Sequence, residues 1–145
     1  MIAVDTNILV YAHREDSPFY AAANKYLRDI AQRKKSWAIA WPSIHEFYAV
    51  VTNPRIYNPP STLTQAINQI ESWLESPTLT ILGESELHWE TLKPLLQSGK
   101  VRGAQVHDAK IAAICLQHQV DQLWSADRDF SRYPQLLVVN PLIET

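Results

Sequence analysis

The chain opens with Ile2-Ala3-Val4-Asp5-Thr6-Asn7-Ile8-Leu9-Val10-Tyr11-Ala12, and this stretch gives the first indication of the fold. Residues 2–4 are a short apolar run typical of a buried strand, and Asp5 follows it directly. Residues 7–12 then favour a short helix. A strand that leads into a helix is the building unit of α/β proteins, in which ligands bind beyond the carboxyl ends of the strands. Asp5 therefore stands where a functional side chain is expected.

The same alternation of strand-like and helix-like segments continues along the chain and predicts a parallel α/β sheet. Residues 53–60 contain three prolines and are predicted to be a loop, as are residues 99–105. Pro94 is expected to kink or split its helix. Further strands are predicted at residues 37–40, 79–82, 122–125 and 136–139, and further helices at residues 18–34, 43–51, 62–75, 84–97 and 106–117.

Length and composition indicate one globular domain, residues 1–145. The chain has 145 residues, of which 46% are hydrophobic and 19% charged, so it can build a sizeable core and is not disordered. The formal net charge is −2. Bulk positive charge is therefore excluded as the means of holding a nucleic acid, and any such partner must be held by local basic groups or by metal ions.

The cysteine count and the apolar runs bear on the cell compartment. Cys115 is the one cysteine of the sequence, which excludes an internal disulfide, and its apolar surroundings predict a buried thiol. No signal-peptide pattern precedes the first strand, and no apolar run approaches the ~20 residues that span a bilayer. We therefore expect a soluble cytoplasmic protein with no membrane contact.

Four acidic residues stand at related places in the predicted topology. Asp5 and Asp127 follow the first and fourth strands, and Glu46 lies in the first turns of the helix after the second strand. Asp108 lies in the first turn of the helix that leads into the fourth strand. Strand exits and the helix starts that follow them share one edge of a parallel sheet. Asp108 reaches that edge only if residues 99–105 bring the chain back to it.

Periodicity supports the two helical acids unequally. Asp108 shares a helical face with Ile111, Ala112 and Cys115, at spacings of three, four and seven. Glu46 has weaker support from its neighbours. If both carboxylates point along apolar faces, each is costly unless it is paired or bound to a metal.

Each acid also has an ordinary structural interpretation. Asp5, Asp127 and Asp129 suit turns, while Glu46 and Asp108 suit helix N-termini through the helix dipole. These interpretations weaken when all of them must hold at once. Four carboxylates that converge repel one another and favour a divalent cation, and Mg²⁺ prefers oxygen ligands. Such a centre activates water and stabilises charge on a phosphodiester.

The four acids stand in segments of distinctive sequence. The segments are, in chain order, Ile2–Ala12, Trp41-Pro42-Ser43-Ile44-His45-Glu46-Phe47, Val106-His107-Asp108-Ala109 and Trp124-Ser125-Ala126-Asp127-Arg128-Asp129-Phe130. Together and in this order they resemble the acidic motifs of PIN domains, and most closely those of the VapC-type toxins of bacterial toxin–antitoxin pairs. The resemblance covers residues 2–142.

The resemblance implies a three-layer α/β/α sandwich around a mainly parallel sheet of about five strands. It implies RNA cleavage with Mg²⁺ or Mn²⁺, a homodimer, and a partner antitoxin that covers a groove near the site. By matching motifs, the catalytic and metal-binding acids would be Asp5, Glu46, Asp108 and Asp127. Thr6, Asn7 and Ser125 match polar positions beside these acids.

Other enzyme classes fit less well. A haloacid-dehalogenase-like phosphatase needs a second Asp where Asn7 stands, and a receiver domain needs a Lys that residues 136–141 lack. His45 and His107 lie beside acids, but without a His-Glu-x-x-His motif they do not indicate zinc. A catalytically idle interaction module of the same fold stays open as the alternative. Phosphate contacts and solvated surface charge are equally open for four nearby basic residues, Arg102, Lys110, Arg128 and Arg132.

Overall fold

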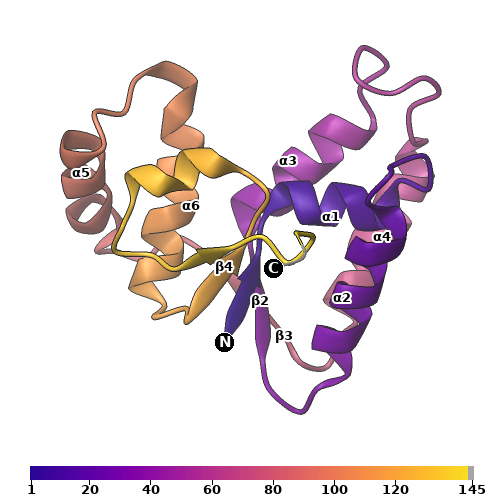
Figure 1. The fold of residues 1–145 in the computed structure, drawn as a ribbon, viewed down its shortest axis with the longest axis horizontal. Helices are drawn as coiled ribbons and strands as arrows, with labels where there is room; N and C mark the ends of the chain where they lie inside the picture. Colours follow the sequence, from indigo (N-terminus) through magenta and orange to yellow (C-terminus); the bar gives the residue numbers. More distant parts are fainter. Residues whose placement is uncertain (144–145) are drawn as a thin grey trace.

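A computed structural model describes residues 1–143 as an α/β structure with a parallel sheet (Figure 1). The strands are β1 (Ile2–Val4), β2 (Trp37–Ala40), β3 (Leu79–Leu82), β4 (Gln122–Trp124) and β5 (Val138–Val139). The helices are α1 (Thr6–His13), α2 (Tyr20–Gln32), α3 (Trp41–Val51), α4 (Leu63–Leu74), α5 (His88–Ser98) and α6 (Val106–Gln117), with short 3₁₀ helices η1 (Gly103–Gln105) and η2 (Arg128–Arg132).

All five strands are parallel and lie in the order β3-β2-β1-β4-β5. This confirms the predicted sheet. Strand β1 pairs with both β2 and β4, so it occupies the centre, and the exits of all strands face the same edge. Two helices begin at that edge without an intervening loop, because Asp5 is the N-cap residue of α1 and Ala40 that of α3. The centre of the sheet thus presents side chains from several segments at one place.

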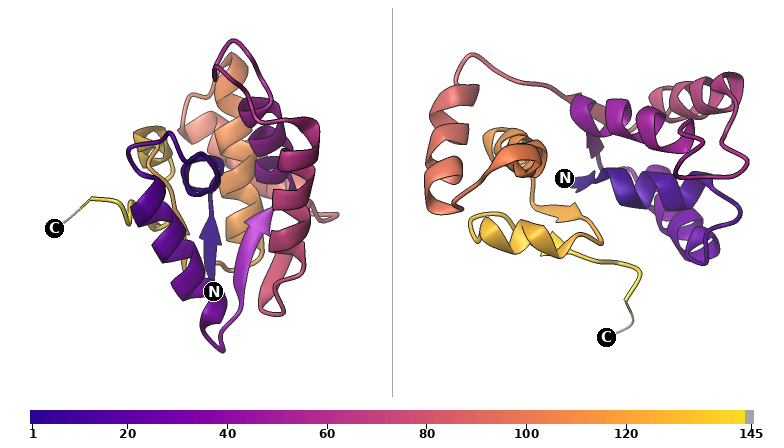
Figure 2. Two further views of the ribbon diagram at one scale, coloured as in Figure 1. Left: turned by 90° about the vertical axis from the view of Figure 1, so that its right-hand side faces the viewer. Right: turned by 90° about the horizontal axis from the view of Figure 1, so that it is seen from above.

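The helices cover both faces of the sheet, as Figure 2 shows from two further directions. Helices α5 and α6 pack on one face, where Ala3, Ala38 and Leu123 meet the apolar side of α6. Helices α1 to α4 enclose the other core, which is built around Trp37 and Phe47. Adjacent strand residues point to opposite faces, so strands β1 to β4 contribute to both cores. Cys115 is buried in the first core as predicted.

Several predicted boundaries were wrong. Helix α5 begins at His88 and not at residue 84, and it runs through Pro94, which does not split it. Pro94 is exposed, so water can satisfy the helix carbonyl that lacks its N–H partner. Strand β5 has only two residues, and the predicted loop at 99–105 contains η1. The segment after β4 forms η2.

Among residues 1–143, no helix combines the length and the apolar character needed to cross a membrane.

Candidate active site

The structure brings the four predicted acids together at the carboxyl edge of the sheet. They line one cavity of about 230 Å³. The other residues that line this cavity are Thr6, Asn7, Val10, Tyr11, Val50 and Tyr57. The chain segment that includes η1 turns back after α5, and it delivers Asp108 to the exits of β1 and β4 as the proposed site required. The catalytic role of these acids remains a prediction.

Asp5 is the buried centre of the site, with only 3% of its surface exposed. It is the N-cap residue of α1, yet its side chain makes no capping hydrogen bond. Ser125 Oγ instead donates to Asp5 Oδ2 at 2.7 Å, and Asn7 Nδ2 approaches the same oxygen at 3.4 Å. The carboxylate is therefore held by Ser125, which directly follows β4, and by Asn7 of α1. A turn-stabilising Asp does not require the contact with Ser125.

Hydrogen bonds of Ser125 and Asn7 connect the segments that follow β1 and β4. The Ser125 hydroxyl donates to Asp5, and it accepts from Asn7 Nδ2 at 3.2 Å and from the backbone N–H of Asp127 at 3.0 Å. These bonds use its one donor and both acceptor positions. Asn7 Oδ1 accepts the backbone N–H of Ala126 at 3.0 Å. Such a saturated network fixes the orientation of the acids it touches.

Glu46 differs from the other acids, because its side chain is exposed. Glu46 therefore does not lie on a buried apolar face, in keeping with the weaker periodicity around it. Its α3 neighbours Phe47 and Ser43 are buried, and Glu46 is turned toward the cavity, where Thr6 Oγ1 donates to its Oε2 at 3.2 Å. Thr6 thereby connects the start of α1 to α3. An exposed carboxylate needs no partner for stability, so its place in the site rests on geometry.

Asp108 lies close to the two acids that follow β4. Carboxylate oxygens of Asp108, Asp127 and Asp129 all lie within 4.8 Å of one another. Asp127 Oδ1 also accepts the backbone N–H of Asp129 at 2.8 Å and so caps η2. Asp127 therefore has the turn-forming role that the sequence allowed, in addition to its place in the cavity. Asp129 is exposed and does not line the cavity.

Crowding and burial raise the pKa values of two acids. Burial raises the pKa of Asp5 to about 6, and the charges of Glu46 and Asp127 add to the effect, although the Ser125 hydrogen bond opposes it. Burial also raises the pKa of Asp108 to about 7. There the protonated carboxyl is favoured by a hydrogen bond with Asp127 and by the charges of Asp127, Asp5 and Glu46. Burial is the main cause of both shifts, and the like charges of the neighbouring acids add to it.

The donor set fits a divalent cation. Within residues 1–143, no Lys, Arg or His lines this cavity, and none of the four acids forms an ion pair. The charged ligands are all carboxylates, with hydroxyl and amide groups behind them. Hard oxygen donors of this kind suit Mg²⁺ or Mn²⁺ and not a soft metal. The ordinary helix-dipole and turn interpretations do not account for four uncompensated acids around one cavity.

Two aromatic residues of the cavity were not anticipated. Tyr57 lies in the loop at residues 53–60, which has no periodicity to indicate what it faces, and Tyr11 sits on the second turn of α1. The four basic residues considered for phosphate contacts do not line the cavity. One of them, Arg132, donates from Nη1 to the carbonyl of Gly99 at 3.1 Å and so has a structural role.

Comparison with known proteins identifies the family. The family model of the PIN domain matches residues 2–136. This chain belongs to the PIN-domain family. The PIN domain here is 32% identical over 142 residues to VapC ribonuclease Mb2897 of Mycobacterium bovis, covering 98% of this chain and 96% of that protein. It is 27% identical over 137 residues to ribonuclease VapC48 of Mycobacterium tuberculosis, covering 94% of each.

Solved structures share the fold of this PIN domain. VapC20 of Mycobacterium tuberculosis, described as a Sarcin-Ricin loop cleaving toxin, aligns with a TM-score of 0.69 at 14% identity, covering 92% of this chain and 95% of that one. VapBC2 from Rickettsia felis, bound to a DNA fragment from its promoter, aligns with a TM-score of 0.67 at 22% identity, covering 96% and 98%. At these sequence identities, the similarity establishes a shared fold.

The two acids after β4 are expected to differ in importance. Asp127→Asn should lower RNA cleavage by at least about tenfold more than Asp129→Asn, because the backbone of Asp127 is held by Ser125 and its side chain lines the cavity, whereas Asp129 is exposed. Cleavage rates of both variants at saturating Mg²⁺ would test this. A larger loss in Asp129→Asn would reverse the assignment.

Proposed function

We propose that this PIN-domain chain is a metal-dependent endoribonuclease, with residues 1–145 acting as one catalytic unit. The observation that carries the proposal is the convergence of Asp5, Glu46, Asp108 and Asp127 on one cavity whose described lining contains no cationic side chain. The family and the relatives named as ribonucleases support RNA as the substrate.

The four acids would hold one or two Mg²⁺ or Mn²⁺ ions, which supply an activated water and neutralise charge on the phosphate. The chain's own contribution is to position the carboxylates. Ser125 and Asn7 hold the buried Asp5, and Thr6 orients Glu46. These hydrogen bonds set the carboxylates before the substrate arrives, which lowers the reorganisation needed during cleavage.

Purified protein should cleave defined RNAs when Mg²⁺ or Mn²⁺ is present and should stop when EDTA is added. The physical reason is that the acids repel a phosphodiester until a cation neutralises them. Gel analysis of end-labelled RNA would show internal cuts. An absence of cleavage over a range of RNAs with either metal would favour the idle interaction module instead.

We further propose that the protein is the toxin of a toxin–antitoxin pair and that a small antitoxin protein covers a groove near the site. Support comes from relatives named VapC and from neighbours such as a toxin–antitoxin complex from Klebsiella pneumoniae. A homodimer is also proposed. Leu87 and Trp89, 61% and 58% exposed, provide apolar surface for association, and light scattering would give the mass in solution.

Expression of the chain alone in a bacterial host should arrest growth and degrade RNA, because nothing restrains the nuclease. Expression of Asp5→Asn to the same level should be harmless. Growth curves and total RNA profiles would report both effects. Normal growth and intact RNA with an active, soluble protein would count against the toxin role while leaving the ribonuclease activity standing.

A further inference from the structure

One wall of the acid-lined cavity is aromatic. Tyr11 and Tyr57 line it together with Val10 and Val50, directly beside the four acids. Metal binding and water activation need the carboxylates but give no role to two phenol rings. A flat apolar surface next to a phosphate site suits a nucleobase, because every base has a π-face that stacks on an aromatic ring.

The Tyr57 ring is held in place by a contact on one of its faces. The guanidinium carbon of Arg14 lies 4.2 Å from the centre of the Tyr57 ring and covers one face of it. Such a cation–π contact fixes the ring plane. The backbone N–H of Tyr57 also donates to the carbonyl of Asn53 at 3.0 Å. A ring that is already ordered loses little entropy when a base stacks on it.

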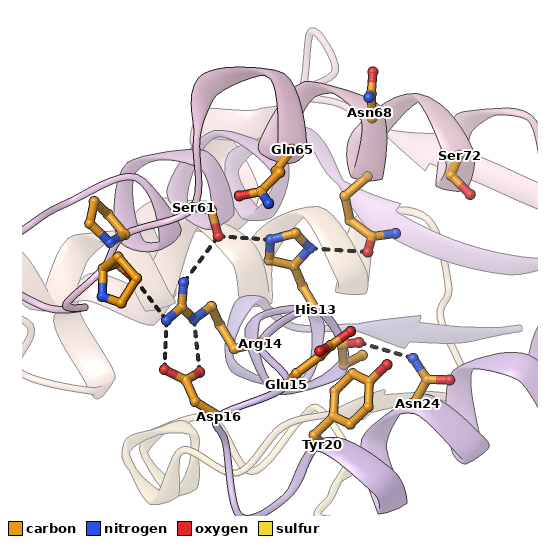
Figure 3. A pocket seen from close by; sticks show the side chains of 14 residues that line it. His13, Arg14, Glu15, Asp16, Tyr20, Asn24, Ser61, Gln65, Asn68 and Ser72 are labelled. Carbon is orange, nitrogen blue, oxygen red and sulfur yellow. Dashed lines mark hydrogen bonds and ion pairs between the residues drawn. The ribbon is translucent and has the colours of Figure 1, made fainter.

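Arg14 is itself fixed by a set of hydrogen bonds in the neighbouring cavity (Figure 3). It donates through two nitrogens to both carboxylate oxygens of Asp16, at 2.9 and 2.6 Å. It also donates to the carbonyl of Pro59 at 3.0 Å and to Ser61 Oγ at 3.3 Å. Arg14 thus anchors the loop that carries Tyr57 to the end of α1.

Helix α1 connects the aromatic wall to the acids. Thr6 in its first turn contacts Glu46, and Tyr11 one and a half turns later packs on Phe19 with ring centres 5.1 Å apart. The cavity volume of about 230 Å³ lies below the roughly 300–1,000 Å³ of sites for drug-sized ligands. The space suits one nucleotide unit and is too small for a paired helix.

We propose that Tyr57, with Tyr11 beside it, stacks a nucleobase that flanks the scissile phosphate; this rests on the proposed ribonuclease function. Arg14 acts as a positioning residue for the Tyr57 ring. The aromatic wall holds the flanking base in place and takes no part in bond cleavage.

The test combines a changed enzyme with a changed substrate. The probe is a single-stranded oligoribonucleotide with a mapped cut site, made also with an abasic ribose on either side of that site. Removal of the stacked base should slow wild-type cleavage roughly tenfold to a hundredfold. Tyr57→Leu should slow cleavage of the intact RNA by a similar factor, with little further loss on the abasic RNA, because both changes remove the same contact.

Two variants serve as controls. Tyr57→Phe keeps the ring and should retain most of the rate. Tyr20→Leu removes a tyrosine that lines the neighbouring cavity but not the acid-lined one, and it should behave as wild type on every RNA. If Tyr57→Leu fails to fold, Arg14→Gln replaces it, and its loss should likewise shrink on the abasic RNA.

Additive losses, or wild-type rates in Tyr57→Leu, would overturn the stacking proposal and leave the ribonuclease assignment intact. If the wild type cuts no RNA, the proposed function fails, and binding then decides the role of Tyr57. In that case, single-stranded RNA carrying 2-aminopurine would be added to the wild type and to Tyr57→Leu. Equal 2-aminopurine fluorescence with the two proteins would overturn the proposal, and quenching of that fluorescence by the wild type alone would support it.

Discussion

Asp5→Asn is expected to abolish RNA cleavage while making the metal-free protein more stable. Asp5 is the most buried of the four acids and is held in the cavity by Ser125. The amide removes a charged metal ligand, so we expect a loss of at least about a thousandfold in rate. Measurement of the cleavage rate with saturating Mg²⁺ or Mn²⁺ tests this loss. Full activity in Asp5→Asn would refute the mechanism.

The expected gain in stability of metal-free Asp5→Asn follows from the raised pKa of Asp5. A carboxyl with a pKa of about 6 in the folded state, against about 3.9 when unfolded, destabilises the fold by about 3 kcal/mol once the pH exceeds both values. The neutral amide avoids this cost, although its N–H₂ group then needs a hydrogen-bond acceptor. A rise in Tm of several degrees at pH 7.5 without metal is expected.

A matched substitution separates this effect from general changes of surface charge. Asp29 is exposed on α2, outside the acid-lined cavity. Asp29→Asn removes the same charge and should change neither the cleavage rate nor the Tm. A lower Tm in metal-free Asp5→Asn, with Asp29→Asn unchanged, would show that the buried carboxylate is better satisfied than its surroundings indicate.

The sequence was sufficient for the fold because its signals are local and repeated. Each strand is a short apolar run, and each is followed or preceded by a helical pattern, so the parallel sheet could be predicted. The errors fall at element ends, where capping and tertiary contacts decide. Helix α5 begins four residues later than predicted, and β5 keeps only Val138 and Val139 of the four residues predicted.

The candidate site was predictable in part for the same reason. Asp5 and Asp127 follow strands, so topology alone brings them to one edge of the sheet. Asp108 required the chain to return through residues 99–105, which no local signal indicates. The exposure of Glu46 and the position of Tyr57 depend on how α3 and its following loop pack, and such long-range contacts leave no periodic trace in the sequence.

The second large effect concerns pH. The folded, metal-free protein should lose stability as the pH rises from about 4 to about 7. Asp5 and Asp108 have folded-state pKa values of about 6 and about 7, both above the unfolded value of about 3.9. Between these values the folded state binds more protons than the unfolded state, so the free energy of unfolding falls with rising pH. Thermal melts in EDTA from pH 4.5 to 8 would measure the trend.

Mg²⁺ should reverse this trend, because it must displace the same protons to bind. At pH 5.5 both carboxyls are largely protonated in the folded state, whereas at pH 8 both are ionised. The affinity for Mg²⁺ is therefore expected to fall roughly a hundredfold from pH 8 to pH 5.5. Calorimetric titration with MgCl₂ in buffers of different ionisation enthalpy would give both the affinity and the number of protons released. In Asp108→Asn the remaining affinity should depend less steeply on pH, since one of the two protons is gone. A wild-type affinity that stays constant across this range would show that Asp5 and Asp108 are not the ligands.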